Sequence, residues 1–457
     1  MFKTILFLAA VLNTGLVHAQ KKYELTIKEA VDLAFKNVLE LKNATIDYRI
    51  QEAKNKEIFG QALPQVNGNF GAQHYMRVPT IPFPNAQNNS IYNILVKEGL
   101  LPNGTEIPGV TFVPVSFQFP WNMNLGATLQ QLLFQPDVFV GLQARQTALN
   151  LSSAVIDQTK EVIKDSAYKR YYAILIGEKQ LHFLNESITR LEKLYHDDSI
   201  MFKNGFAERL DLERVQVQLN NLKTTQSVVG SYIQLGYAGL KFALGISQKD
   251  TVVLKDVLTT ESIKENLLEA NFKYEDRTEI RTLELAKELR ELDVKRYKLG
   301  YLPTVALAAN YNITGMGRKF FTSDETFWIK SSYVGLNVSI PIFDGFQRKY
   351  KTQQAMLNVE KAENNISNVK QVIDLQQVIT QETLKNSLLN LDMQERNLAL
   401  AQKVYNTTKL KFEQGLGSSF EVLQADADYQ TAQSNYFTSL YNATVARISY
   451  QSALGKL

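Results

Sequence analysis

The chain has 457 residues, of which 45% are hydrophobic and 21% charged, a composition that excludes wholesale disorder. A net charge of +4 over this length does not indicate nucleic-acid binding. Because the chain has no cysteine, disulfides, thiolate metal ligands, a thiol nucleophile and a lipidated N-terminal cysteine are also excluded.

Residues 1–19 are predicted to be a secretory signal peptide. Lys3 precedes an apolar run from Ile5 to Leu12, and Val17-His18-Ala19 supplies a small-residue cleavage site before Gln20. The alternative, a membrane anchor, is disfavoured because the run is too short to span a bilayer. No later segment offers about 18 uninterrupted apolar residues. The mature protein is therefore expected to be exported and soluble, or to sit in an outer membrane as β-strands.

The remaining chain repeats its landmarks. Gly205 and Gly415 each interrupt a helix-like segment and lie 210 residues apart, as do the Ala-Leu-Gly triplets ending at Gly245 and Gly455. An internal two-fold repeat is therefore predicted. The first repeat covers 20–245 and the second covers 246–457. Each is expected to hold a helix, a strand pair (64–131 and 303–341) and a long helical hairpin (tips near 202–210 and 412–420).

The first half is longer between matching landmarks. Leu63-Pro64 and Leu302-Pro303 are 239 residues apart, whereas the later landmarks are 210 residues apart. About 30 extra residues therefore fall in the first half. They lie in Val78–Pro114, which is rich in Pro and Asn and is predicted to be an extended loop.

Four segments alternate apolar and polar residues with period two: Val66–Ala72, Phe117–Leu129, Val305–Ile313 and Val334–Ile340. This pattern suits transmembrane β-strands, although a half-buried sheet of a soluble protein has the same alternation. The polar positions are rich in Asn and Gln, as a wet lumen requires. The only tryptophans, Trp121 and Trp328, lie within or just before these strands, as membrane-interface aromatics would.

Four strands cannot close a membrane barrel, since eight is about the smallest usual number. An open sheet edge is not viable in lipid. The chain is therefore predicted to share one barrel among subunits arranged in a closed ring.

Long helices are predicted on both sides of the glycine breaks. Val138–Lys203 and Gln347–Glu413 contain no proline, and a helix of about 65 residues is roughly 100 Å long. After each break the seam positions step by three and four residues, as in a coiled coil. These positions are Leu212, Val215, Leu219, Leu222, Gln226, Val229, Ile233, Gly236, Leu240 and Ala243, then Val422, Ala425, Tyr429, Ala432, Tyr436, Ser439, Ala443, Ala446, Tyr450 and Ala453.

Five segments follow one another in this order: LTIKEAVDLAFKNVLELKNA (25–44), QALPQVNGNFG, LNVSIPIFDGFQRK, GLGSSFEVLQADADYQTAQ and the closing ALG. Together they resemble the TolC-like outer-membrane efflux proteins over nearly the whole mature chain. The resemblance implies a mixed α and β fold. Long α-helical coiled-coil hairpins form a periplasmic α-barrel, and each chain adds four strands to a trimeric transmembrane β-barrel.

The resemblance also implies location and partners. It places a homotrimer among the lipids of the outer membrane of a Gram-negative-type bacterium, with a periplasmic extension. It implies a passive exit duct that docks to a periplasmic adaptor (membrane fusion protein) and an inner-membrane transporter. Drug, metal and protein export share this duct in the family, so no particular cargo is implied.

The same resemblance implies two kinds of site. The hairpin tips would contact the adaptor, through Phe202, Gly205, Phe206, Phe412, Gly415 and Leu416. Each tip glycine can supply the φ > 0 residue that ends the incoming helix. Ser418 or Ser419 can cap the outgoing one in the second tip.

The second site is the pore constriction. In the family, two acidic residues one helical turn apart ring the tunnel entrance, and the matching positions here are Glu421 and Gln424. Asp211 is the first-repeat equivalent. Gln424 departs from the pattern and puts a second acidic ring in doubt, because Asp426 and Asp428 are expected off that face. The alternative is that first-turn acids only stabilise the helix dipole, by about 0.3–1 kcal/mol.

No catalytic constellation is present. His74, His182 and His196 have no metal-ligand spacing, and the sequence contains neither a phosphate-binding loop nor a G-x-S-x-G motif. An enzyme, a metal site and a cofactor are therefore not expected. The competing function is an exported coiled-coil scaffold or adhesin without channel activity.

Overall fold

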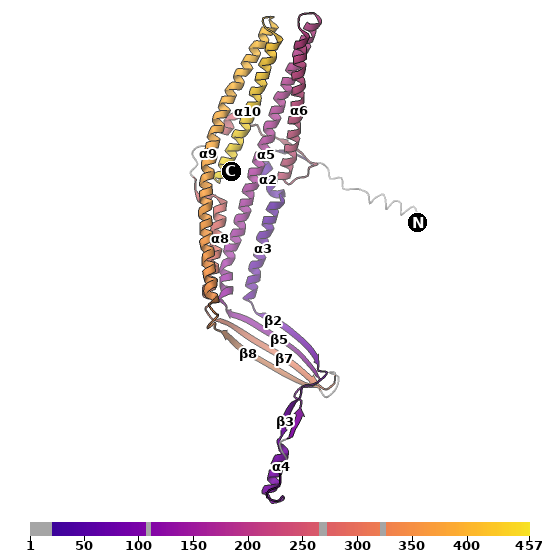
Figure 1. Ribbon diagram of the computed structural model, residues 1–457, viewed down its shortest axis with the longest axis vertical. Helices are drawn as coiled ribbons and strands as arrows, with labels where there is room; N and C mark the ends of the chain where they lie inside the picture. Colours follow the sequence, from indigo (N-terminus) through magenta and orange to yellow (C-terminus); the bar gives the residue numbers. More distant parts are fainter. Residues whose placement is uncertain (1–20, 107–110, 265–271, 320–325) are drawn as a thin grey trace, which may run out of the picture. The chain divides into compact units, whose positions relative to one another are not determined.

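The computed structural model describes residues 21–106, 111–264, 272–319 and 326–457, so the predicted signal peptide lies outside the described residues. The described chain mixes helices and strands, which confirms the predicted fold class (Figure 1). The helices are α2 (Ile27–Asn37), α3 (Leu39–Gln61), α4 (Ala86–Lys97), α5 (Pro136–Lys203), α6 (Arg209–Ala243), α7 (Thr260–Lys264), η1 (Tyr274–Asp276), α8 (Thr278–Leu299), α9 (Gln347–Glu413) and α10 (Ser419–Ala453). The strands are β1 (Lys22–Leu25), β2 (Gln65–His74), β3 (Ile81–Asn85), β4 (Thr111–Val115), β5 (Trp121–Phe134), β6 (Thr251–Leu254), β7 (Thr304–Gly317) and β8 (Phe327–Ser339).

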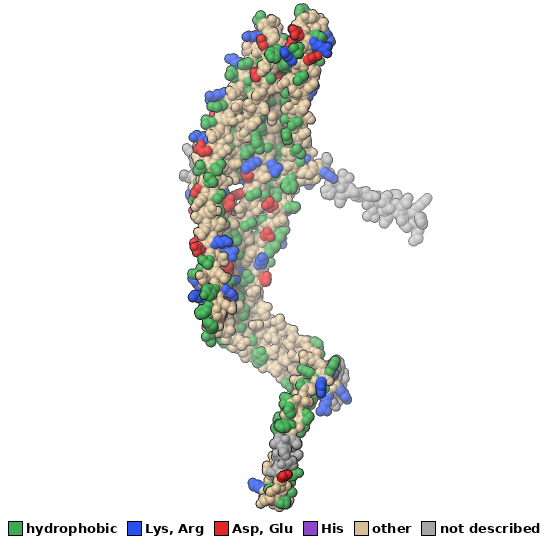
Figure 2. Space-filling view, in the orientation of Figure 1, with side chains coloured by type: hydrophobic (Ala, Val, Ile, Leu, Met, Phe, Trp, Pro, Cys, Tyr) green, Lys and Arg blue, Asp and Glu red, His purple; other side chains and the backbone are tan. Residues whose placement is uncertain are grey.

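The chain divides into two compact units. We call them the helical unit (Met1–Glu52, Gln146–Arg290 and Leu357–Leu457) and the sheet unit (Ala53–Arg145 and Glu291–Met356). Each unit gathers segments from both halves of the sequence. Uncharged side chains and backbone (tan) dominate the visible face of the four-stranded sheet, whereas charged side chains are scattered over the helices (Figure 2).

Two long hairpins form most of the helical unit. The first hairpin is α5 and α6, and the second is α9 and α10; α5 has 68 residues and α9 has 67, as the uninterrupted helical pattern predicted. No helix among the described residues is long and apolar enough to cross a membrane.

The predicted heptad seams form the core of these hairpins. In α10 every predicted seam residue except the half-buried Tyr436 is buried. In α6 five apolar seam residues are buried, Val215, Leu219, Leu222, Ile233 and Leu240, while Leu212 and Val229 are half-buried. They pack with α5 residues such as Leu191 and Ile174 in two apolar clusters. The small residues of the α10 seam allow the close helix approach that the sequence indicated.

The repeated Ala-Leu-Gly triplets end α6 and α10 in the same way. Gly245 has φ +65° and Gly455 has φ +70°, the left-handed conformation that favours glycine. A Cβ on Gly245 would lie 2.8 Å from the carbonyl carbon of Asn37, and one on Gly455 would lie 2.6 Å from the carbonyl oxygen of Asp276. Both helix ends therefore need glycine for conformation and for close packing.

The first described residues are tied into the helical unit. β1 pairs in parallel with β6, which follows the first hairpin. Thr26 then begins α2 with a capping box, because Glu29 N–H donates to Thr26 Oγ1 and Thr26 N–H donates to Glu29 Oε2. Tyr171 Oη of α5 donates to Leu25 O at 2.9 Å, which fixes this segment against the first hairpin.

The sheet unit is built on an antiparallel sheet of order β2-β5-β7-β8. Its register puts Val66, Leu129, Ala309 and Val334 in one row, and Asn67, Thr128 and Asn310 in the next. Successive rows point to opposite faces. We call these the apolar face and the polar face. The predicted alternation thus holds over most of the sheet, with apolar side chains on one face and Asn, Gln and Thr on the other. The exception is the start of β8, where Phe327 and Ile329 fall on the polar face and Lys330 and Ser332 on the apolar face.

The structure corrects two strand-level expectations. Phe117–Pro120 is not part of a strand, because β5 runs from Trp121 to Phe134. The prediction of an extended loop over Val78–Pro114 is wrong. This segment contains β3, α4 and β4, with β3 and β4 paired as an antiparallel ribbon. Its prolines and asparagines suggested a loop, but three prolines lie inside a two-stranded ribbon, where each strand is an edge that tolerates proline.

The connections of the sheet leave at opposite ends. α3, α5, α8 and α9 all join the end of the sheet where β2 and β7 begin, while the β2–β5 and β7–β8 connections lie at the other end. Among the described strands, β2 and β8 are the edges, and each has one side without a strand partner.

Candidate functional site at the hairpin tips

The first hairpin turns at Gly205, which has φ +78°. Phe206 N–H donates to Met201 O at 2.8 Å and Gly205 N–H donates to Phe202 O at 3.0 Å. This pair of hydrogen bonds is the Schellman motif, which satisfies the last carbonyls of α5.

The second hairpin repeats this turn. Gly415 has φ +76°, Leu416 N–H donates to Lys411 O at 2.9 Å, and Gly415 N–H donates to Phe412 O at 2.9 Å. Ser418 caps α10, since its Oγ accepts from Glu421 N–H at 3.2 Å. Ser419, the other predicted cap, is instead buried and donates to Asp198 Oδ2 of α5.

Both tips expose large apolar side chains. Phe206 and Leu416, the residues directly after the two glycines, are 80% and 76% exposed. Phe202 is also exposed and Phe412 is half-buried. The tip residues proposed from the sequence therefore form two matching exposed turns in the described part of the chain.

Asp211 lies in the first turn of α6 beside a cation. Arg214 Nη1 is 3.5 Å from Asp211 Oδ1, and the Arg214 guanidinium lies 4.9 Å from the ring centroid of Phe420 at the start of α10. Asp211 is thus partly neutralised within α6, and Arg214 links the outgoing helices of the two tips.

Glu421 and Gln424 lie on an exposed face of α10, and a third residue joins them. Gln424 Nε2 donates to Asp428 Oδ1 at 3.1 Å, and both side chains are exposed. Positions 421, 424 and 428 share one helical face, since residues three, four and seven apart align. The expectation that Asp428 lies off this face is therefore wrong. Asp426 is off it, because its side chain is fully buried.

Asp426 belongs to a buried polar layer that sequence reasoning missed. Arg190 Nε of α5 donates to Asp426 Oδ1 at 3.2 Å. The Arg190 guanidinium lies 5.4 Å from the ring centroid of Tyr405 and 5.1 Å from that of Tyr429, and these two rings are stacked. Arg190 therefore joins the first hairpin to both helices of the second through an ion pair and two cation–π contacts.

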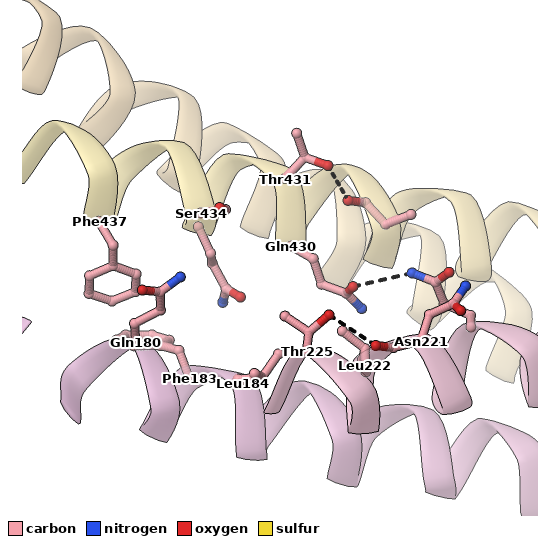
Figure 3. A pocket seen from close by; sticks show the side chains of 13 residues that line it. Gln180, Phe183, Leu184, Asn221, Leu222, Thr225, Gln430, Thr431, Ser434 and Phe437 are labelled. Atoms are coloured by element: carbon pink, nitrogen blue, oxygen red, sulfur yellow. Dashed lines mark hydrogen bonds between the residues drawn. The ribbon is translucent and has the colours of Figure 1, made fainter. Parts of the chain in front are cut away.

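The polar layer continues along α10 into a cavity of about 300 Å³ between α5, α6 and α10. Gln430 Nε2 donates to Asp426, and Gln218 Nε2 of α6 donates to Gln430 Oε1 at 3.3 Å, one of the dashed lines in Figure 3. Gln433 also lines the cavity, and its buried Nε2 has no hydrogen-bond partner among the described residues.

Two buried acids near the tips have altered proton affinities. Burial raises the pKa of Asp426 above its ordinary value, against the opposing effect of Arg190. Burial also raises the pKa of Asp198, which the hydrogen bond from Ser419 partly offsets and which Asp211 and Asp197 reinforce.

The two tryptophans lie in the sheet unit, on its apolar face and at the end away from the helices. Trp121 is opposite Gly317, and Trp328 is opposite Gly315. The His74 and Trp121 rings are 4.2 Å apart between centroids. No group of three or more His, Cys, Asp or Glu side chains among the described residues could hold a metal ion.

Comparisons with known proteins agree with this arrangement. Residues 275–456 match the family model of the outer membrane efflux protein. The protein CyaE of Bordetella pertussis is 22% identical over 69% of this chain and 68% of its own length. The outer membrane protein TolC of Escherichia coli is 18% identical over 72% of this chain and 68% of its own length.

The fold is also that of solved channels. The crystal structure of CusC aligns with a TM-score of 0.72 at 15% identity, covering 94% of this chain and 91% of that one. Over residues 275–456 the chain is thus similar to the outer membrane efflux proteins, and over 94% of its length it has the fold of solved outer-membrane channels. The matched family and TolC are both outer-membrane proteins.

Proposed function

We propose that the chain forms the passive exit duct of a tripartite efflux or secretion system. Three copies share one twelve-stranded transmembrane barrel and one periplasmic helical barrel. The helical tips dock to a periplasmic adaptor, which connects the duct to an inner-membrane transporter. In this account the first and second halves are repeats of one plan, each supplying two strands and one long hairpin.

The main support for this proposal is the four-stranded sheet β2-β5-β7-β8. Lipid requires an apolar outer surface, and a water-filled lumen requires a polar inner one. The apolar and polar faces of the β2-β5-β7-β8 sheet meet these two requirements. The side of each edge strand that lacks a partner would leave unpaired N–H and C=O groups in the hydrocarbon, which is not tolerated.

Closure by copies of the same chain fits the strand directions. Neighbouring strands of the sheet are antiparallel, so β2 and β8 run in opposite directions. The β8 edge of one copy can therefore continue the antiparallel sheet into the β2 edge of the next. A head-to-tail contact of this kind closes into a ring, and three copies supply twelve strands.

The helical unit carries surfaces that suit the same ring. Exposed large apolar residues are frequent on α6 and α9 and rare on α10. On α6 they are Leu210, Val217, Val228, Tyr232, Leu235 and Phe242; within the helical unit α9 exposes Leu357, Val372, Leu375, Val378, Ile379, Leu389, Met393, Leu400, Val404 and Leu410. Exposed apolar surface of this extent marks a protein contact, because monomeric soluble proteins rarely leave it uncovered. We assign these stripes to contacts between neighbouring copies.

The constriction is assigned to the exposed face of α10. Glu421 supplies the first carboxylate, Gln424 a neutral position, and Asp428 a second carboxylate two turns along the helix. Three copies would place six carboxylates around the axis. Asp211 contributes less to this field, because Arg214 partly neutralises it.

The membrane interface is assigned to the sheet end that carries Trp121 and Trp328. Amphipathic rings favour the boundary between hydrocarbon and headgroups. Lys330 lies two residues beyond Trp328 on the apolar face, and a lysine at that depth can extend its amine toward the headgroups.

Two measurements on the intact protein test the proposal. Outer membranes are washed with salt and with alkaline carbonate, and native mass is determined in detergent. We expect the protein to stay with the membrane and to have the mass of three chains. Elution by carbonate would favour the exported scaffold, and a stable monomer or dimer would contradict the shared barrel.

A further inference from the structure

The segment between β2 and β5 forms a substructure of its own, which we call the insertion (residues 75–120). Its base is fastened to the sheet, since Tyr75 N–H donates to Pro120 O at 2.7 Å. The Phe119 ring lies 5.6 Å from that of Phe327, the first residue of β8. The base of the insertion thus borders both edge strands, β2 and β8.

The ribbon within the insertion is apolar on both faces. Its register places Ile81, Phe83, Val113 and Val115 on one face, and Pro82, Pro84, Phe112 and Pro114 on the other. Phe83 is 53% exposed and Phe112 is 64% exposed. An isolated two-stranded ribbon is at best marginally stable in water, so both faces require a cover.

Composition favours a protein over a lipid as that cover. The insertion has four charged residues, Arg77, Lys97, Glu98 and Glu106. Helices that lie on a membrane surface are rich in Lys and Arg on their polar face, whereas α4 contains Lys97 alone. Aromatic residues with few charges are typical of the core of a protein interface. In Figure 2, hydrophobic side chains (green) lie on the surface of this segment.

Symmetry and position point to a particular partner. In a cyclic trimer each copy uses two different surfaces, one toward the next copy and one toward the previous copy. The two distinct apolar faces of the ribbon meet that requirement. The prolines remove backbone donors from the ribbon edges, so contact is made by side chains and not by added strands.

We propose that the three insertions of the trimer pack against one another, the Phe83 face of one copy on the Phe112 face of the next, as an apolar ring at the sheet end away from the helices. The inference rests on the trimer of the proposed function. The ring would fasten the subunits to one another where each sheet ends.

Cysteine crosslinking tests this contact, because the full-length chain has no native cysteine. The Phe83→Cys/Phe112→Cys double variant is oxidised in outer membranes and run on a non-reducing gel. Covalent dimers and trimers should form the major species. Each single variant should stay monomeric, and so should a Val257→Cys/Phe112→Cys control, in which one exposed site lies outside the insertion.

Native mass in detergent separates the possible failures. A wild-type trimer whose double variant shows no crosslink overturns the inference and leaves the proposed function standing. A wild-type monomer overturns both. If the Phe83→Cys variant labelled with a fluorophore is quenched by brominated lipid without crosslinking, lipid covers the insertion and the inference is wrong.

Discussion

Asp198 is a buried acid held by one hydrogen bond, from Ser419, across the two hairpins. Its Oδ1 atom has no hydrogen-bond partner among the described residues. Because its pKa in the folded chain is raised, the folded state keeps a proton that the unfolded chain has already lost. This difference in protonation defines a pH window that begins near the ordinary Asp pKa of about 4 and extends to higher pH. Within it, the contribution of Asp198 to stability falls as pH rises.

Asp198→Asn should therefore flatten the loss of stability between about pH 4 and neutrality and raise the melting temperature at neutral pH. Ser419→Ala should do the opposite, since it removes the hydrogen bond that lowers the pKa. Helical circular dichroism during heating, at several pH values, measures both. Parallel pH profiles for wild type and Asp198→Asn would contradict the account.

Arg190 and Asp426 form a second cross-hairpin contact whose partners depend on each other. Asp426→Ala leaves the guanidinium beside the Tyr405 and Tyr429 rings without its carboxylate. Removing one partner of a buried pair costs about 3–5 kcal/mol, and we expect the lower end because Arg190 is 21% exposed.

Denaturant unfolding of the detergent-solubilised protein measures that cost. The Arg190→Met/Asp426→Leu double variant should lose less than Asp426→Ala, because it leaves no unpaired charge. If Asp426→Ala unfolds within about 0.5 kcal/mol of wild type, the pair does not stabilise the hairpin contact.

At the scale of elements, the two tip glycines set the direction of each hairpin. Gly205→Pro and Gly415→Pro replace a residue of φ near +77° by one fixed at about −65°. Each also removes the amide hydrogen that closes the Schellman turn. We expect export to be lost while outer-membrane insertion persists, because the substitutions lie in the helical unit and insertion depends on the sheet unit.

Gly230→Ala is the matched control. Gly230 lies inside α6 with open space around it, so alanine should be neutral or stabilising by about 0.5–1 kcal/mol. Cargo export from cells and the amount of protein in the outer membrane are measured for all three variants. Normal export by both proline variants would show that the tips are only connectors.

The elements that follow a local rule could be predicted from the sequence. The absence of proline predicted α5 and α9, and the turn glycines predicted both tips. Period-two alternation predicted the faces of the sheet. The Phe83-bearing ribbon was missed because local composition favours a loop wherever proline recurs, and only pairing of β3 with β4 reveals strands.

The candidate site was predicted less completely. The resemblance to the efflux-protein family implied Glu421 and the tip residues, whereas Asp428 was expected off that face although it lies seven residues after Glu421. The Arg190–Asp426 pair joins residues 236 positions apart. No local pattern signals such a contact, because it depends on how the hairpins pack.

At the scale of the whole molecule, the proposed trimer would turn single carboxylates into rings. Carboxylates that converge on one axis attract cations and raise one another's proton affinity. The purified channel in a planar bilayer should therefore be cation-selective, and divalent cations added on the periplasmic side should block it.

Glu421→Gln and Asp428→Asn should each weaken that block, and the double variant should weaken it most. The trimer should remain intact, since both changes preserve size and helix. Lys97→Gln, a charge change in the insertion, serves as a control and should leave the block unchanged. Unaltered selectivity in the double variant would leave helix-dipole stabilisation as the role of Glu421.

The most direct test of the shared barrel joins its two free edges. A cysteine is fixed at Asn69 in β2, and a second is moved along β8 from Ile329 to Asn337 in the cysteine-free chain. Oxidation in outer membranes should give covalent trimers that peak at one position of β8 and recur with period two, as a β-ladder between subunits requires. Monomers at every position, or crosslinks confined within one chain, would contradict the account.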